Sequence, residues 1–152
     1  MNIVPLPLKE ITEAHLQLML CADPSRKLIN SYLKRACCFQ LLEAKQLVGI
    51  VALLPTRPET IEIVNLAVLG SYQNQGYGQR LLNFALDFAR QQNYLSVEIG
   101  TGSTSFQQLA LYQKYGFRMT SIDQDYFVRH YETPIFENQL ELKDMVRLQL
   151  IL

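Results

Sequence analysis

The stretch "QNQGYGQR", from Gln73 to Arg80, carries two glycines one residue apart, between an apolar run and an amphipathic segment. Glycine lets the backbone approach another group closely. The first amides of a following helix are unpaired and lie at the positive end of the helix dipole, so they suit an anion such as a pyrophosphate. Arg80 adds positive charge there. A tight strand-to-helix turn that binds nothing is the alternative interpretation.

Two other phosphate-binding motifs do not fit this stretch. A P-loop needs Gly-Lys-Ser or Gly-Lys-Thr, and neither occurs in the sequence. A dinucleotide fingerprint needs a third glycine three residues after the second, and that position is Leu81. The pattern that remains is Gln73-x-x-Gly76-x-Gly78. A short glycine pattern of this kind needs further context before it indicates a ligand.

Glu62 is the candidate general base. Period-two alternation along "IEIVNLAV" predicts that it shares one strand face with Val64, Leu66 and Val68. A carboxyl group on an otherwise apolar face is expected to have a raised pKa, which suits a base. An exposed glutamate near the start of the strand, beyond the edge of the core, is the alternative.

Tyr112, on the predicted helix over 105–115, is the candidate general acid. Its phenol can donate a proton to a leaving group. A core tyrosine with a satisfied hydroxyl is the alternative, and Tyr115 is a second phenol nearby. His15 is expected to be at the surface or satisfied. His130 is expected to be a solvated loop residue, with a substrate contact or a second base as the other interpretations. No cluster of His, Cys and carboxylate residues predicts a metal site.

These residues must be positioned by the elements around them. Strands followed by helical crossovers predict an α/β chain with a mixed sheet covered by helices. The expected helices cover 13–22 after a Thr12 cap, a segment ending near Lys34, 76–92 and 105–115; the expected strands are "NIVPLPL", 37–43, 47–54, 60–69, "YLSVEIGT", "FRMTSI" and "MVRLQLIL". The segment 123–142 has no clear period.

Length and composition predict one domain over 1–152, with a packed core and no strong charge bias. Fourteen basic and fourteen acidic residues cancel, which argues against a nucleic-acid partner held by bulk charge.

Cys21, Cys37 and Cys38 form a poor disulfide or metal framework, so free thiols in a reducing compartment are expected. No signal peptide and no apolar run of about 18 residues are visible, so we expect a cytoplasmic protein without a membrane partner.

Two motifs together resemble a known family. "NLAVLGSYQNQGYGQRLL" and, about thirty residues later, "LYQKYGF" are similar to the acetyl-CoA turn and the tyrosine segment of the GNAT superfamily, acyl-CoA-dependent N-acyltransferases. The resemblance covers about 46–122. It implies the family fold, a mixed and mostly antiparallel sheet flanked by helices, and acetyl-CoA as co-substrate without a metal.

The resemblance also implies roles for individual residues. The turn would bind the pyrophosphate of coenzyme A, the end of the preceding strand would pair with the pantetheine arm and supply an N–H for the oxyanion, Glu62 would be the base and Tyr112 the acid. Ser105 stands where many members have a cofactor-contacting asparagine seven residues before the tyrosine. The implied cofactor-binding residues are Leu66, Ala67, Val68, Gln73, Asn74, Gln75, Gly76, Tyr77, Gly78, Gln79, Arg80 and Ser105.

The implied reaction is acetyl transfer to a primary amine. An amine with a pKa near 10.4 is unprotonated in only about one molecule in 2,500 at pH 7, so a base is needed. Acidic and aromatic residues interleave over 123–142 and favour a small cationic amine. A peptide α-amine or a lysine side chain, a non-catalytic acyl-CoA-binding module, and an unrelated nucleotide binder stay open. The apolar end "LQLIL" suggests a homodimer.

Overall fold

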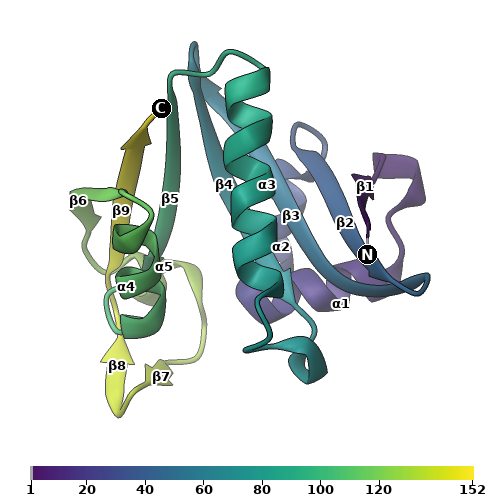
Figure 1. Cartoon of the computed structure of the whole chain (residues 1–152). Helices are drawn as coiled ribbons and strands as arrows, with labels where there is room; N and C mark the ends of the chain where they lie inside the picture. The colour runs from purple at the N-terminus through teal and green to yellow at the C-terminus, as the bar shows by residue number, and fades with distance from the viewer. Residues whose placement is uncertain (1) are drawn as a thin grey trace. The chain divides into compact units, whose positions relative to one another are not determined.

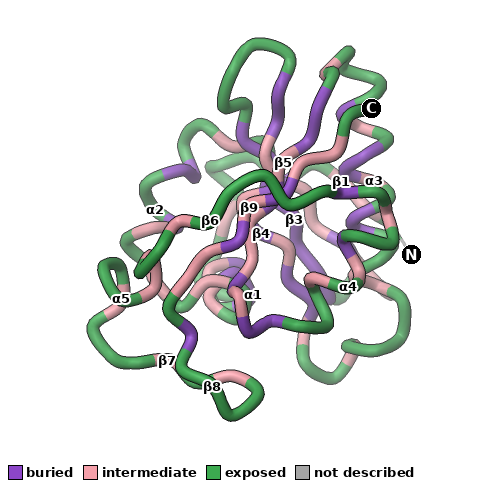
Figure 2. The backbone as a smooth tube through the Cα atoms, turned by 90° about the vertical axis from the view of Figure 1, so that its left-hand side faces the viewer, coloured by how far each residue is buried: buried purple, intermediate pink, exposed green. Residues whose placement is uncertain are grey.

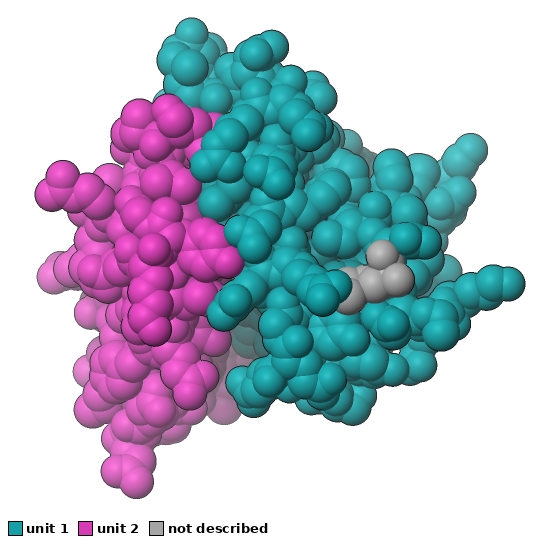
Figure 3. Space-filling view, in the orientation of Figure 1, with its two compact units in different colours: residues 1–95 teal, residues 96–152 magenta. Residues whose placement is uncertain are grey.

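The computed structural model describes residues 2–152. The chain divides into two compact units, Met1–Leu95 and Ser96–Leu152, which are coloured differently in Figure 3. Within each unit the strands pair antiparallel, and each unit has its own helices. The predicted α/β class, with a mostly antiparallel sheet flanked by helices, is confirmed.

The sheet of the first unit runs in the order β1 (Asn2–Pro5), β2 (Cys37–Glu43), β3 (Gln46–Arg57) and β4 (Thr60–Val68), as Figure 1 shows. The outer position of β1 was expected from its prolines, which cannot donate to a sheet on both sides. The predicted hairpin of β2 and β3 is confirmed, and β3 continues three residues further than predicted, to Arg57.

Two helices, α1 (Glu13–Ala22) and α2 (Arg26–Leu33), cover one face of this sheet. Their buried Met19 and Ile29 pack in one cluster with Ile50 of β3. Thr12 caps α1 as predicted, in a reciprocal capping box with His15. His15 also bonds Gln40 through its second ring nitrogen at 3.0 Å, so the expectation of a satisfied histidine is confirmed.

The long helix α3 (Tyr77–Gln91) covers the opposite face and stands in front of the sheet in Figure 1. It approaches β3 closely at Gly49, where a Cβ atom would lie 2.9 Å from Cδ1 of Leu81. A glycine at position 49 therefore lets the helix lie against the strand. The short 3-10 helices of this unit, η1 (Leu8–Glu10) and η2 (Gly70–Tyr72), follow β1 and β4.

A β-bulge interrupts β4 and changes the face of the sheet on which Glu62 lies. Leu53 lies opposite Ile63 and Ala52 lies opposite Asn65, so Val64 is an extra residue in the strand. The bulge puts Glu62, which lies opposite Leu54, on the α1–α2 side of the sheet together with Asn65. Leu66 and Val68 lie on the α3 side. The prediction that Glu62 shares their face is wrong, because period-two counting assumes a strand without a bulge.

The second unit is built on β5 (Ser96–Gly102), β9 (Met145–Ile151) and β6 (Arg118–Asp123), in that spatial order. The helix α4 (Phe106–Lys114) matches the prediction. The C-terminal strand β9 is paired on both sides, by β5 and β6. From Met145 to Gln149, β9 therefore has no free edge, which removes most of the outer strand that the homodimer prediction needs.

The segment with no predicted period contains a short helix, α5 (Tyr126–His130), and a hairpin of β7 (Ile135–Glu137) and β8 (Leu140–Leu142). Asn138 and Gln139 form its two-residue turn, and both have positive φ, 54° and 66°, as a type I′ turn requires. Within residues 2–152, the helices are all too short or too polar to cross a membrane.

Candidate active site

The turn before α3 is held in shape by glutamine side chains. Nε2 of Gln73 donates to the carbonyl of Val68 at 3.0 Å, and Nε2 of Gln75 donates to the carbonyl of Ser71 at 3.1 Å. The backbone amide of Gln73 also donates within the turn, to the carbonyl of Gly70. Gln73 therefore ties the turn to the end of β4.

Gly76 is the N-cap of α3 and has φ 89°, in the left-handed region that favours glycine. Because it has no side chain, nothing from this residue caps the amides of Tyr77, Gly78 and Gln79, which form the first turn. A Cβ atom at Gly76 would find no atom within 4 Å, and one at Gly78 would meet only Cγ2 of Val68, at 3.9 Å. The space beside both glycines is therefore open to within ordinary contact distance of the described residues.

The aromatic side chains beside the turn face the β2–β3 hairpin. The rings of Tyr72 and Tyr77 meet edge to face at 5.6 Å, and the Tyr77 hydroxyl donates to Glu43 at 3.3 Å. Desolvation, followed by the Glu43 carboxylate, raises the pKa of Tyr77. These contacts occupy the side chain of Tyr77, so its backbone amide is the group that remains for a ligand. Asn74 and Arg80 are exposed.

The end of β4 leads directly into this turn. Leu66, Ala67 and Val68 lie opposite Val51, Ile50 and Gly49 of β3. Their backbone is thus fixed on one side by the sheet, as a binding edge for an extended ligand arm requires.

Glu62 is half-buried on the α1–α2 side of β4. Sequence analysis missed its neighbour Asn65, whose Nδ2 donates to the carbonyl of Met19 and to the hydroxyl of Tyr32, each at 3.1 Å. Asn65 is 3% exposed, and its Oδ1 has no hydrogen-bond partner within residues 2–152. These bonds fix α1 and α2 to the bulge beside Glu62. The sequence signal that could have identified Asn65 was a single side-chain amide inside an apolar strand.

Tyr112 lies on α4 in the second unit and is 9% exposed. Its ring packs beside Phe117, with centroids 6.0 Å apart. Burial raises the pKa of Tyr112 to about 12, so the phenol keeps its proton throughout the neutral range. No described residue, from Asn2 to Leu152, hydrogen-bonds to its hydroxyl. Tyr115 is half-buried at the C-cap of α4.

The loop between β5 and α4 carries two buried hydroxyls. Ser105 is the N-cap of α4 and is 7% exposed, yet its side chain caps no amide. Thr104 is 5% exposed, and its Oγ1 has no partner among the described residues. Sequence analysis identified Ser105 and missed Thr104, because a Thr beside a helix start is ordinary in any loop.

The β7–β8 hairpin lies against this loop. Leu142 packs on Gly102, where a Cβ atom would be 2.5 Å from its Cδ1. Pairing places Glu137 on the same face of the hairpin as Leu142. At the hairpin tip, Nδ2 of Asn138 donates to the carbonyl of Thr104 at 2.8 Å. The Oε1 atom of Glu137 is buried and has no partner within the described chain. A carboxylate oxygen and a hydroxyl in this region thus both lack a donor or acceptor.

The two other groups considered from sequence contribute less. His130 ends α5, exposed, with its ring 4.4 Å from that of Tyr126. It therefore lies in a helix where a loop was predicted. Across residues 2–152, no group of three or more His, Cys, Asp or Glu side chains is arranged to hold a metal ion.

Comparison with known proteins agrees with this geometry. The model of the acetyltransferase (GNAT) family matches residues 9–117. The N-acetyltransferase YvbK of Bacillus subtilis is 45% identical over 142 residues, which are 93% of this chain and 92% of that protein.

Solved structures extend the likeness to the whole chain. A Bacillus subtilis acetyltransferase in complex with CoA is 44% identical, with a TM-score of 0.93, over 99% of this chain and 98% of that one. A GNAT family acetyltransferase from Elizabethkingia anophelis with acetyl-CoA bound is 39% identical, with a TM-score of 0.94, over 99% of this chain and 97% of that one. Motifs, fold and relatives therefore agree: the chain belongs to the acetyltransferase (GNAT) family and is an N-acetyltransferase.

Proposed function

We propose that residues 1–152 form one catalytic domain that transfers the acetyl group of acetyl-CoA to the primary amine of a small cationic acceptor. Acetyl-CoA is held at the start of α3 and along the end of β4. Glu62 acts as general base and Tyr112 as general acid. The free thiols Cys21, Cys37 and Cys38 support a reducing, cytoplasmic setting.

The open first turn of α3 is the observation that carries the proposal. Gly76 needs its glycine for a positive φ, but Gly78 is helical and meets only Val68, at ordinary contact distance. A helical glycine costs about 1 kcal/mol relative to alanine, and no protein atom requires the space. A pyrophosphate bound to the amides there would use it. The relatives crystallised with CoA and acetyl-CoA support the same ligand.

The rest of the cofactor would run along β4. The backbone of Leu66, Ala67 and Val68 would pair with the pantetheine arm, and an N–H there would bind the oxyanion. The Ser105 hydroxyl, buried and not used as a helix cap, would supply one hydrogen bond to the cofactor.

Glu62→Gln is expected to lower kcat/KM about 10²-fold at pH 7, because the acceptor ammonium then has no base to take its proton. Below an amine pKa near 10.4, each pH unit raises the free-amine fraction about tenfold. The variant should therefore recover as pH rises from 7 to 9, while the wild type changes less. Initial rates of thiol release against pH measure this. Glu59→Gln, an exposed carboxylate in the β3–β4 turn, is the matched control. Equal wild-type and Glu62→Gln rates at pH 7 remove Glu62 from the role.

The acceptor class is argued from the β7–β8 hairpin. The buried Oε1 of Glu137 and Oγ1 of Thr104 both lack hydrogen-bond partners among residues 2–152, and an unpaired buried carboxylate oxygen is costly. An ammonium group has three donors and a positive charge, so it would satisfy the carboxylate and the hydroxyl together. This supports a cationic amine over a neutral one.

Thiol release from acetyl-CoA across polyamines, aminoglycosides, free amino acids and peptides tests the function. We expect the highest kcat/KM with small polycationic amines. Glu137→Gln should raise KM for the best amine about 10–100-fold, because one charge-assisted hydrogen bond is lost, with the dissociation constant of acetyl-CoA unchanged. Glu141→Gln, which pairs on the other face of the same hairpin, is the control. Preference for peptide α-amines or lysine side chains would replace the small-amine acceptor, and equal KM values for the two variants would exclude Glu137.

A further inference from the structure

Three buried side-chain atoms lack a hydrogen-bond partner within residues 2–152: Oδ1 of Asn65, Oγ1 of Thr104 and Oε1 of Glu137. The last two belong to the acceptor region proposed above, whereas Asn65 lies in β4, in the other unit. Buried and half-buried residues make up the whole of this strand (Figure 2). Because a buried polar atom without a partner lowers stability, packing alone does not explain an asparagine at this position.

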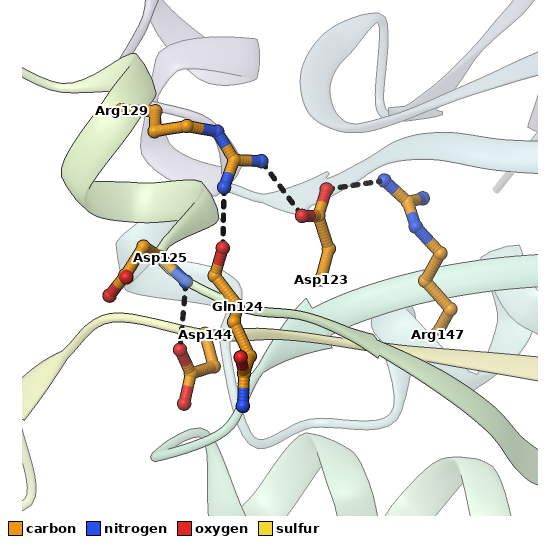
Figure 4. Close-up of polar contacts among 6 residues, drawn as sticks. All are labelled: Asp123, Gln124, Asp125, Arg129, Asp144 and Arg147. Carbon is orange, nitrogen blue, oxygen red and sulfur yellow. Dashed lines mark hydrogen bonds and ion pairs between the residues drawn. The ribbon is translucent and has the colours of Figure 1, made fainter.

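The charged cluster at the end of β6 shows the usual arrangement of polar groups. Asp123 lies between Arg129, at 2.7 Å, and Arg147, at 3.7 Å, and the backbone amide of Asp125 donates to Oδ1 of Asp144 at 2.9 Å (Figure 4). These residues are exposed or half-buried, so water can complete their hydrogen bonds. The unpaired amide oxygen in β4 has no such access to water, since it is buried.

The side-chain nitrogen of Asn65 joins three elements at one point. Nδ2 donates to the carbonyl of Met19 on α1 and to the hydroxyl of Tyr32 on α2, each at 3.1 Å. A carbonyl can only accept, so the nitrogen must face Met19. Oδ1 is then left on the other side of the amide, without a donor among the described residues. Asn65 therefore holds β4 against both helices at the expense of an unpaired oxygen.

The bulge in β4 places this link next to Glu62. Glu62 lies opposite Leu54 and Asn65 opposite Ala52, and Leu54 and Ala52 are two residues apart in β3. Glu62 and Asn65 are thus consecutive side chains on the α1–α2 side of the sheet. A bulge disrupts the ladder of backbone hydrogen bonds, so the strand beside Glu62 depends more than usual on side-chain contacts for its position.

We propose that Asn65 is a positioning residue for the base. By tying the bulge to α1 and α2, it holds the Glu62 carboxylate where it can take a proton from the acceptor ammonium; this rests on the role proposed for Glu62. A reacting group displaced by about 1 Å loses much of its effect on the rate. The two bonds from Asn65 add little net stability, because the unpaired oxygen offsets them. The amide therefore affects the rate more than the fold.

Asn65→Val removes the two donated bonds together with the unpaired oxygen, and a β-branched residue suits a strand. The Met19 carbonyl keeps its helical bond from the amide of Asp23, at 3.0 Å. The melting temperature should therefore stay within about 4 °C of the wild-type value. We expect kcat/KM at pH 7 to fall about 10–100-fold, with the dissociation constant of acetyl-CoA unchanged. Thiol-release kinetics, thermal denaturation and calorimetric titration measure these quantities.

Two further variants keep the test sharp. Ile29→Val shortens a fully buried side chain in the cluster that contains Met19 and Tyr32. It should lower the melting temperature by about 2–6 °C and keep the wild-type rate. Tyr32→Phe removes one acceptor of the Asn65 amide and keeps the ring in the core, so it should fold even if Asn65→Val does not. We expect it to lower kcat/KM about 3–10-fold.

The pH dependence separates positioning from a general loss of structure. As pH rises from 7 to 9, more of the acceptor amine is unprotonated and needs no base. Asn65→Val should therefore recover towards the wild-type rate, as Glu62→Gln does, whereas a variant with a damaged fold is slow at every pH. In a Glu62→Gln background, Asn65→Val should add no further loss, because both changes act on one group.

The outcomes distinguish Asn65 from the base that it would position. If Glu62→Gln is slow and Asn65→Val is not, Asn65 has no positioning role and Glu62 keeps its own. Losses that multiply in the double variant, a loss equal at pH 7 and pH 9, or an equal loss in Ile29→Val also overturn the proposal. Wild-type rates in Glu62→Gln would remove the base itself, and the role of Asn65 with it.

Discussion

Tyr112→Phe is expected to lower kcat about 10²–10³-fold and to leave the dissociation constant of acetyl-CoA unchanged. The variant removes one oxygen atom and keeps the ring that packs beside Phe117. Loss of a general acid costs rate in this range, because the thiolate that leaves the tetrahedral intermediate is no longer hydrogen-bonded. Thiol-release kinetics, together with calorimetric titration of acetyl-CoA, measure the two quantities separately.

The environment of Tyr112 defines how it would act. Burial raises its pKa to about 12, whereas an ordinary thiol has a pKa near 8.5. Full proton transfer from the phenol to a thiolate is then uphill by about 5 kcal/mol. The phenol would therefore donate a hydrogen bond to the developing thiolate, and complete transfer would be coupled to loss of the proton from the acceptor amine. Because the phenol stays neutral, its ionisation should not reduce the wild-type rate between pH 7 and 10.

Stability separates this role from that of an ordinary core tyrosine. A buried hydroxyl that is hydrogen-bonded contributes about 1 kcal/mol to the free energy of unfolding, and removing it leaves its partner unpaired. The Tyr112 hydroxyl has no partner within residues 2–152, so the free energy of unfolding of Tyr112→Phe should be unchanged or slightly higher. Tyr115→Phe, on the same helix, is the control and should keep the wild-type rate. If instead Tyr115→Phe is slow and Tyr112→Phe is not, the acid is Tyr115.

The sequence predicted the elements well where local signals were strong. Thr12 at the start of α1 and the glycines before α3 marked helix boundaries within one or two residues. The longer strands also matched, because their apolar runs end at turn residues. These features depend on neighbours along the chain, so a single sequence contains them.

Features that depend on distant partners were missed. The bulge at Val64 arises from the register with β3, and no local pattern marks it, so Glu62 was placed on the wrong face. Each strand of the β7–β8 hairpin has only three residues, which is too short to show an alternation of apolar and polar residues. The tip of the hairpin is held by a hydrogen bond from Asn138 to Thr104, 34 positions away. The covered edges of β9 likewise follow from which strands become its neighbours.

Gly78→Val is expected to raise the dissociation constant of coenzyme A about 10²–10⁴-fold while the protein stays folded. The added side chain would occupy the open space beside Gly78, where we propose that the pyrophosphate lies. Hydrogen bonds from amides to a charged group contribute about 1.5–3 kcal/mol each, and loss of two corresponds to this range of affinity. Calorimetric titration with coenzyme A gives the constant, and circular dichroism shows whether α3 and the fold are retained.

Stability and affinity should change in opposite directions in a graded series at this position. Alanine and valine both stabilise a helix relative to glycine, and a Cβ atom at Gly78 meets no protein atom closer than 3.9 Å. Gly78→Ala should therefore raise the melting temperature and weaken coenzyme A binding, and Gly78→Val should weaken it further. Asn83→Val, at an exposed site on α3, controls for the effect of valine on the helix and should bind normally. Unchanged affinity in Gly78→Val would mean that the pyrophosphate does not lie at these amides, because no bound phosphate could share that space with a valine side chain.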